Sequence, residues 1–162
     1  MQNLNINHIG MSVPNLDDAI NWYSTVFGFC LLRQVTRSRP ETPDSPIFTM
    51  YGPVMQKAKI AFMTAGNGIG FELFEFVDPQ FEAPERTFEE GEFTRGGLFH
   101  FAITVPDVGA LADKAVENGG RQICGPVGMG SGEYALYVAD PWGNVIECMS
   151  CSFELLVGQQ RS

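Results

Sequence analysis

"HIGMSVPNL", residues 8–16, returns later in the chain as "HFAITVPDV", residues 100–108. His, Val and Pro occupy the same places in both copies, and small or hydroxyl residues match at two further positions. The chain has only two histidines, His8 and His100, and each begins one copy. Because internal repeats decide architecture, this match predicts a duplicated module with an equivalent histidine in each half.

The residues after each copy predict the same order of secondary structure. Asn15 and Asp107 are good helix N-caps, and apolar spacing predicts helices over 16–28 and 108–120. Strand-like runs follow in both modules, at 29–37, 57–65 and 70–77 and at 121–127, 133–139 and 144–150. Each module therefore reads strand, helix, strand, strand, strand, and the predicted fold class is α+β.

These elements divide one predicted domain, residues 1–162, into four parts. The parts are module one at 4–78, a linker at 79–96, module two at 97–151 and a C-terminal tail at 152–162. A Pro-rich insertion at 38–56 interrupts module one, and we expect it to be a loop with a short helix around "PIFTMYG".

The linker and the tail each allow two interpretations. The Glu-rich linker is either a solvated connection or a mobile lid whose Phe81, Phe88 and Phe93 close over a ligand. The apolar tail "SFELLVG" either contacts a second subunit or covers an open sheet edge.

Composition limits the partners that the protein can have. With 44% apolar residues in 162, the chain can build a core without disulfides, and the net charge of −9 argues against nucleic acid and anionic membranes. The sequence shows neither a secretion signal nor a run of about 20 apolar residues. We therefore expect a cytoplasmic protein whose cysteines are reduced and largely buried, at positions 30, 124, 148 and 151. "CMSC", residues 148–151, lies in a predicted strand, which does not favour a redox or zinc site.

Both histidines are predicted to lie on the less bulky face of their strands. Side chains alternate along a strand, so His8 shares a face with Gly10 and Ser12. By the same rule His100 shares a face with Ala102 and Thr104. The opposite faces carry large apolar residues that suit packing beneath the helix of each module. The histidine faces instead suit the wall of a cavity.

A carboxylate repeats in the same way as the histidine. Glu72 and Glu147 lie in the last strand of each module, among large apolar neighbours where an unpaired carboxylate is costly. A divalent cation would offset this cost, because it binds both carboxylate and neutral imidazole. Glu75 lies on the opposite face from Glu72 and is the weaker candidate. The predicted metal ligands are His8, Glu72, His100 and Glu147.

At these residues the chain resembles the vicinal oxygen chelate superfamily, which includes glyoxalase I, epimerases, extradiol dioxygenases and bleomycin-binding proteins. The motifs that carry the resemblance are "HIGMSVPNLDDAINWYSTVFGF", "GFELFEF", "GLFHFAITVPDV" and "DPWGNVIECM". The resemblance implies two βαβββ modules that curl around one shared site for a divalent ion (Ni, Zn, Mn, Fe or Co). It places the ligands at the four residues named above, and it implies a homodimer.

The ligand set is most similar to that of glyoxalase I and the epimerases. The resemblance then implies a lyase, isomerase or epimerase that moves a proton α to a carbonyl of a small substrate through a metal-bound enediolate. It makes a ligand glutamate the base, and we favour Glu147 over Glu72. Ser12 stands where bacterial glyoxalase I carries an Arg for glutathione, so we do not expect a glutathione-specific enzyme.

Two other functions stay open at this point. Extradiol dioxygenases share three of the four ligands, and non-catalytic drug-binding members share the fold. Neither "GNGIG" nor "GPVGMGSGEY" has the Lys of a phosphate loop, and the second is expected to be a hairpin loop at the cavity mouth. Possible substrate contacts are Ser12, Thr104, Met129 and Tyr134. Three arginines at 33, 37 and 39 either hold an anionic group or are simply solvated.

Overall fold

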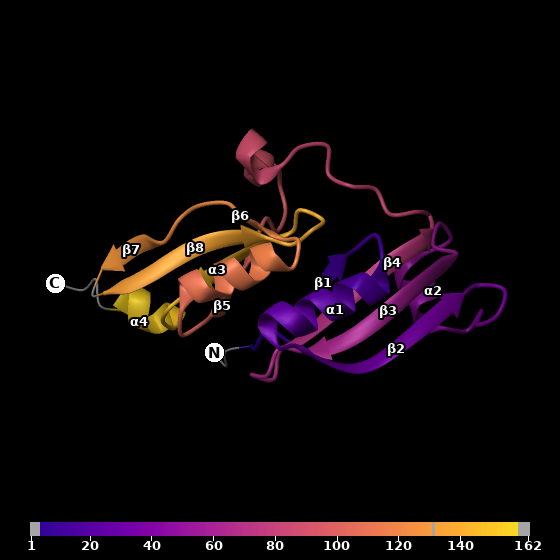
Figure 1. The fold of residues 1–162 in the computed structure, drawn as a ribbon. Helices are drawn as coiled ribbons and strands as arrows, with labels where there is room; N and C mark the ends of the chain where they lie inside the picture. The colour runs from indigo at the N-terminus through magenta and orange to yellow at the C-terminus, as the bar shows by residue number, and fades with distance from the viewer. Residues whose placement is uncertain (1–3, 131, 159–162) are drawn as a thin grey trace. The chain divides into compact units, whose positions relative to one another are not determined.

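A computed structural model describes residues 4–130 and 132–158 of the chain (Figure 1). The chain divides into two compact units, Met1–Ala83 and Pro84–Ser162, and each is described by itself. Each contains a β-sheet with helices packed on it, so the α+β class predicted from the sequence is confirmed. Within the described residues, no helix is both long enough and apolar enough to cross a membrane.

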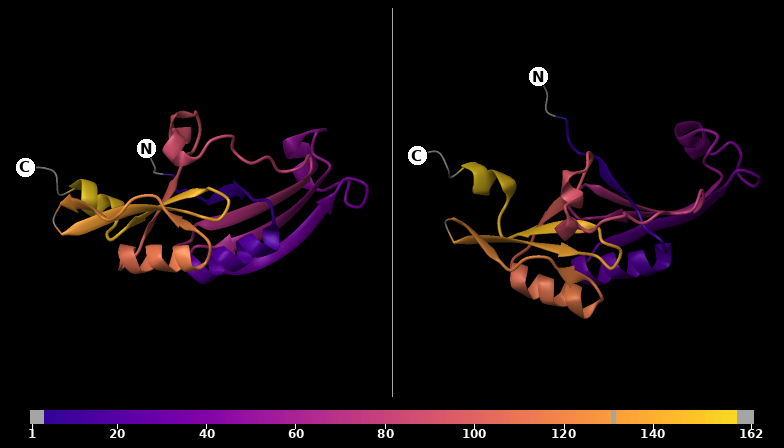
Figure 2. Two further views of the ribbon diagram at one scale, coloured as in Figure 1. Left: turned by 45° about the horizontal axis from the view of Figure 1, so that its top comes forward. Right: turned by 90° about the horizontal axis from the view of Figure 1, so that it is seen from above.

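The first unit is a four-stranded sheet with the strand order β1-β4-β3-β2. The first strand runs parallel to the last, whereas the other pairs are antiparallel. The strands are β1 (His8–Ser12), β2 (Cys30–Ser38), β3 (Lys57–Thr64) and β4 (Gly70–Asp78). Helices α1 (Leu16–Phe27) and α2 (Pro46–Tyr51) lie on opposite faces of this sheet (Figure 2).

Helix α1 begins and ends where the sequence predicts. The Asn15 side chain accepts a hydrogen bond from the Asp18 backbone N–H at 3.1 Å, which satisfies one of the free donors of the first turn. Gly28 ends the helix in the left-handed conformation at φ 72°. The buried face of α1 packs on the sheet through Tyr23, whose ring centroid lies 4.7 Å from that of Phe71.

Helix α2 lies in the Pro-rich insertion, as expected, and it covers part of the other face of the sheet. Ile47 and Phe48 of this helix form a core cluster with Ile60 and Phe74 of the sheet. Arg39 is held here, because its guanidinium donates to the carbonyls of Gly52 and Met55 and stacks 4.6 Å from the Phe48 ring. This arginine therefore has a structural role.

The second unit repeats the plan with additions. Its sheet has the order β5-β9-β8-β6, and an extra strand, β7, also pairs with β8. The strands are β5 (Phe101–Thr104), β6 (Arg121–Gln122), β7 (Val127–Gly130), β8 (Glu133–Ala139) and β9 (Val145–Met149). Helices α3 (Val108–Glu117) and α4 (Phe153–Gly158) lie on opposite faces of it (Figure 2).

Two details of the second unit differ from the sequence prediction. The strand expected over 121–127 is divided into Arg121–Gln122 and a second strand that begins at Val127. The gap contains Gly125 and Pro126, and proline has no N–H to donate to a sheet. The expected hairpin loop begins instead with a paired strand, β7, in which Val127 faces Ala135.

The prediction that the cysteines are largely buried needs correction. Cys30 is exposed on an edge strand, whereas Cys148 and Cys151 are buried.

Candidate metal centre

The first His–Glu pair forms between two parallel strands of the first unit. Gly10 lies beside Glu72 in the β1–β4 register, and His8 lies beside Gly70. This register directs the His8 and Glu72 side chains to one face, where His8 Nε2 lies 3.6 Å from Glu72 Oε2. The His8 side chain is 47% exposed and that of Glu72 is 23% exposed. The pair can therefore meet a ligand from solvent.

Two neighbours fix the His8 ring. The other ring nitrogen, Nδ1, lies 2.8 Å from the Asn7 side-chain oxygen, so a proton on Nδ1 leaves Nε2 free to bind a metal. Gly70 leaves room for the base of the His8 side chain, because a Cβ at this position would lie 3.1 Å from the His8 Cβ. Asn7 was not among the residues predicted from the sequence. Its position immediately before His8 is the sequence feature that could have indicated a hydrogen bond to the imidazole.

The second unit forms the same pair. His100 immediately precedes β5, and its Nε2 lies 3.4 Å from Glu147 Oε2 of β9. The two side chains are 24% and 19% exposed, so this pair is more enclosed than the first. Among the described residues, His100 Nδ1 is a buried side-chain nitrogen without a hydrogen-bond partner. Nε2 and the carboxylate are the groups of this pair that face each other.

A cavity of about 320 Å³ adjoins the second pair. His100, Thr104 and Glu147 form its polar part, and the Thr104 hydroxyl donates to the Cys151 carbonyl at 3.3 Å. The other lining residues are mostly apolar, and two of them come from α4: Ala102, Ile103, Met149, Phe153 and Leu156. Part of the predicted tail therefore lines this cavity.

Tyr137 also belongs to the second pair, although the sequence interpretation missed it. It lies directly opposite Glu147 in the antiparallel β8–β9 register, and its ring stands edge-on to His100 with the centroids 5.4 Å apart. Burial raises the pKa of the Tyr137 hydroxyl, and the negative charge of Glu147 and a hydrogen bond to it raise the pKa further. The phenol therefore stays protonated and can donate to the carboxylate.

Glu75 has a different role from Glu72, as expected from strand alternation. One Glu75 oxygen accepts a hydrogen bond from the Leu16 backbone N–H at 2.9 Å, at the start of α1. The other lies 2.8 Å from Lys59 Nζ, and the resulting hydrogen bond raises the pKa of Lys59. The Glu75 carboxylate thus satisfies a free helix donor and is already occupied.

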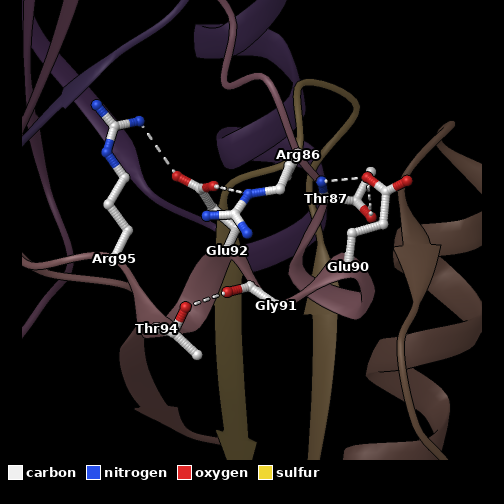
Figure 3. A network of polar contacts seen from close by, with 7 residues as sticks. All are labelled: Arg86, Thr87, Glu90, Gly91, Glu92, Thr94 and Arg95. Carbon is white, nitrogen blue, oxygen red and sulfur yellow. Dashed lines mark hydrogen bonds and ion pairs between the residues drawn. The ribbon is translucent and has the colours of Figure 1, made fainter.

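The linker is folded where it joins the second unit. Thr87 and Glu90 form a reciprocal capping box, with the Thr87 N–H donating to Glu90 Oε2 at 2.8 Å. Arg86 and Arg95 both lie within ion-pair distance of Glu92, at 3.7 and 3.3 Å (Figure 3). These contacts order the segment that carries η1 (Phe88–Glu90) and η2 (Glu92–Thr94).

Two of the three predicted lid residues form an aromatic cluster at the second pair. The Phe88 ring lies 5.1 Å from Phe93 and 5.6 Å from Tyr137, between centroids. Glu89, which follows Phe88, forms an ion pair with Arg121 of β6. Phe81 is part of the first unit and donates its backbone N–H to Phe76. Phe88 therefore packs against Tyr137, which contacts both His100 and Glu147.

The predicted substrate contacts divide into two groups. Ser12 lies on the same strand face as His8, and Thr104 lines the cavity beside His100. Tyr134 lies three residues before Tyr137, on the other face of β8 from Glu147, and its backbone N–H donates to Ser150. Met129 lies on β7, which pairs with β8 beyond the part that faces Glu147. Of these four residues, only Ser12 and Thr104 therefore lie on the strand faces that carry the histidines.

The donors in both pairs suit a divalent transition metal. Each unit presents one imidazole Nε2 and one carboxylate on the same sheet face, and both groups are ligands for Zn²⁺ and related ions. Among the described residues, no group of three or more His, Cys, Asp or Glu side chains is placed to hold a metal ion. Each pair by itself supplies two ligands.

The cysteine beside Glu147 in the sequence is not a competing thiolate ligand. Burial raises the pKa of the Cys148 thiol to about 12, so that thiol is protonated.

Sequence comparisons identify the family to which this fold belongs. The chain belongs to the Glyoxalase/Bleomycin resistance protein/Dioxygenase superfamily, whose family model matches residues 5–148. Over 150 residues it is 27% identical to a 2-epi-5-epi-valiolone epimerase of an Actinomyces species, covering 90% of this chain and 78% of the epimerase. It is also 30% identical over 142 residues to a lactoylglutathione lyase of Arabidopsis thaliana, covering 86% of this chain. The match spans 42% of the plant enzyme.

Solved structures confirm the fold. A glyoxalase family protein from Bacillus cereus superimposes with a TM-score of 0.75 at 21% sequence identity. The match covers 92% of this chain and 95% of the bacterial protein. At this identity the likeness establishes the glyoxalase-like architecture, whereas the reaction has to be argued from the site.

Proposed function

We propose that this chain is a divalent-metal-dependent enzyme that moves a proton on the carbon beside a carbonyl group of a small substrate. The observation that carries the proposal is the repeated pair, with Nε2 of His8 3.6 Å from Glu72 and Nε2 of His100 3.4 Å from Glu147. The enzymes to which the chain is similar include an epimerase and a lyase, which supports this reaction class.

In this proposal His8, Glu72, His100 and Glu147 together hold one divalent cation (Ni, Zn, Mn, Fe or Co). The four ligands come either from one chain or from two subunits of a homodimer. When bound, the cation supplies a positive charge that stabilises the negative charge developing on the substrate oxygen. Asn7 orients the imidazole of His8 through Nδ1, and this directs Nε2 to the ligand position.

Glu147 is the proposed base. It borders the cavity of about 320 Å³ in which a small substrate can approach its carboxylate. An oxygen of Glu147 takes the proton from the carbon next to the carbonyl, and in an isomerisation the same carboxylic acid returns it to the neighbouring carbon. In an epimerisation a water molecule instead delivers a proton to the opposite face of the first carbon, and Glu147 releases its proton to solvent. The balance is a proton removed and a proton replaced, so the reaction is an isomerisation or epimerisation without an oxidant.

The surroundings of the site favour a small substrate over a glutathione adduct. Ser12 stands four residues after His8, where bacterial glyoxalase I carries an Arg, and the Thr104 hydroxyl already donates to the Cys151 carbonyl. Phe153 and Leu156 of α4 add an apolar wall to the cavity beside Glu147. We therefore expect a compact carbonyl compound whose carbon skeleton packs on this wall. The homodimer and the cytoplasmic location stay predictions from the sequence.

The test uses the chain loaded separately with Ni²⁺, Zn²⁺, Mn²⁺, Fe²⁺ and Co²⁺. Each form is incubated in deuterium oxide with a panel of small ketones, α-hydroxy ketones and hemithioacetals, and proton exchange at the α-carbon is followed by NMR. The expected result is metal-dependent exchange with no oxygen consumed. Oxygen uptake with catechols under Fe²⁺ or Mn²⁺ would replace the proposal with a dioxygenase. Unchanged thermal stability with every cation would leave a small-molecule binding protein.

A further inference from the structure

The two glutamates of the duplicated pairs face different partners on the neighbouring strand. In the first unit Phe62 of β3 lies directly opposite Glu72 of β4. In the second unit Tyr137 of β8 lies directly opposite Glu147 of β9. Residues directly opposite in an antiparallel pair share a face and have neighbouring Cβ atoms. The equivalent positions therefore differ by one hydroxyl group, and that hydroxyl stands beside only Glu147.

The Tyr137 ring is fixed on two sides, which gives its hydroxyl a defined direction. The edge-on contact with His100 brings the ring centroids to 5.4 Å at an interplanar angle of 76°. On another side Phe88 packs against the ring at 5.6 Å, and the Tyr137 backbone N–H donates to Cys124 Sγ at 3.3 Å. A ring restrained in this way loses little further freedom when its hydroxyl donates to a carboxylate.

We propose that Tyr137 is a positioning residue that orients the Glu147 carboxylate toward its metal ligand position, and that Glu72 has no such partner at the equivalent position. The inference rests on the proposed function, because it assigns Glu147 to the metal. Hydrogen bonds to the ligating carboxylates of metal sites commonly govern affinity and activity, and their removal typically costs 10–100-fold. The two halves of the duplicated site are therefore unequal, with one glutamate oriented by a phenol and the other beside a phenyl ring.

The test is Co²⁺ binding by the full chain, because it needs no substrate. Co²⁺ affinity is measured by competition with a chromophoric chelator, and the visible absorption spectrum reports the ligand geometry. Tyr137→Phe removes the hydroxyl but keeps the ring that packs on His100 and Phe88. We expect the Co²⁺ dissociation constant to rise by about tenfold and the spectrum to change.

Tyr23→Phe is the matched control. It also removes one phenol hydroxyl, which donates to Met11 Sδ at 3.1 Å on the α1 side of the first sheet. This variant should bind Co²⁺ with the wild-type affinity and spectrum. Equal losses in both variants would assign the effect to general destabilisation and overturn the inference. Wild-type binding in Tyr137→Phe would also overturn it, and would leave the proposed function intact. Absence of Co²⁺ binding in the wild type would overturn both.

Discussion

The two units build one pair of residues in two different environments. In the first unit, His8 is 47% exposed, its ring is held by Asn7, and its partner Glu72 faces Phe62. In the second unit, His100 is 24% exposed and its partner Glu147 faces Tyr137. The comparison shows that the candidate ligands occupy equivalent positions of the repeat, whereas the residues that surround them differ.

We infer from this difference that the two units contribute differently to the proposed reaction. The cavity of about 320 Å³ and the apolar wall from α4 adjoin the second pair. The aromatic cluster of the linker also packs on the second unit, through Phe88 and Tyr137. We therefore expect changes at Glu147 to affect proton transfer, and changes at Glu72 to affect mainly how firmly the metal is held.

The largest expected effect separates the two glutamates. Glu147→Gln should slow α-proton exchange by about 10²–10⁴-fold at saturating metal, because an amide cannot serve as the base. Glu72→Gln, the matched change in the first unit, should need more metal but keep exchange within about tenfold of the wild type once loaded. Both rates are measured by NMR in deuterium oxide with the compound that the screen identifies. The reverse order of the two variants would transfer the base role to Glu72.

The sequence predicted most of the scaffold because the duplicated motif repeats residue types that act locally. Asn15 and Asp107 accept hydrogen bonds from the first-turn N–H groups of α1 and α3, as their N-cap positions predict. Strand alternation also predicted which side chains share a face, and within each unit the histidine lies near the glutamate, His8 near Glu72 and His100 near Glu147. That these residues bind a metal stays a prediction.

What the sequence could not supply is strand register and the path of irregular segments. Tyr137 is significant only because the β8–β9 register places it opposite Glu147, and no local pattern reveals that register. The cavity wall from α4 depends on how the tail turns back after Cys151. The strand expected over 121–127 is present only at Arg121–Gln122 and at Val127, and Pro126, which has no N–H to donate to a sheet, lies in the gap.

A smaller effect should distinguish Glu75 from Glu72 in the first unit. Glu75→Ala removes a charged acceptor from the Leu16 N–H at the start of α1, so the free energy of unfolding should fall by about 2 kcal/mol. Urea denaturation of the metal-free chain measures this loss. Metal affinity should stay unchanged, because Glu75 lies on the α1 side of the sheet. An affinity loss as large as that of Glu72→Gln would instead make Glu75 a ligand.

The most direct test of the central claim, that both His–Glu pairs hold one ion, is the metal stoichiometry of three proteins. Wild type, His8→Ala and His100→Ala are dialysed to equilibrium against free Co²⁺ at about ten times the wild-type dissociation constant, and bound metal is measured by elemental analysis. A shared ion predicts saturation of the wild type at about one Co²⁺ per chain, and loss of nearly all bound metal in each variant. Two ions per chain in the wild type, with one retained in each variant, would contradict the account and show that the two pairs bind independently.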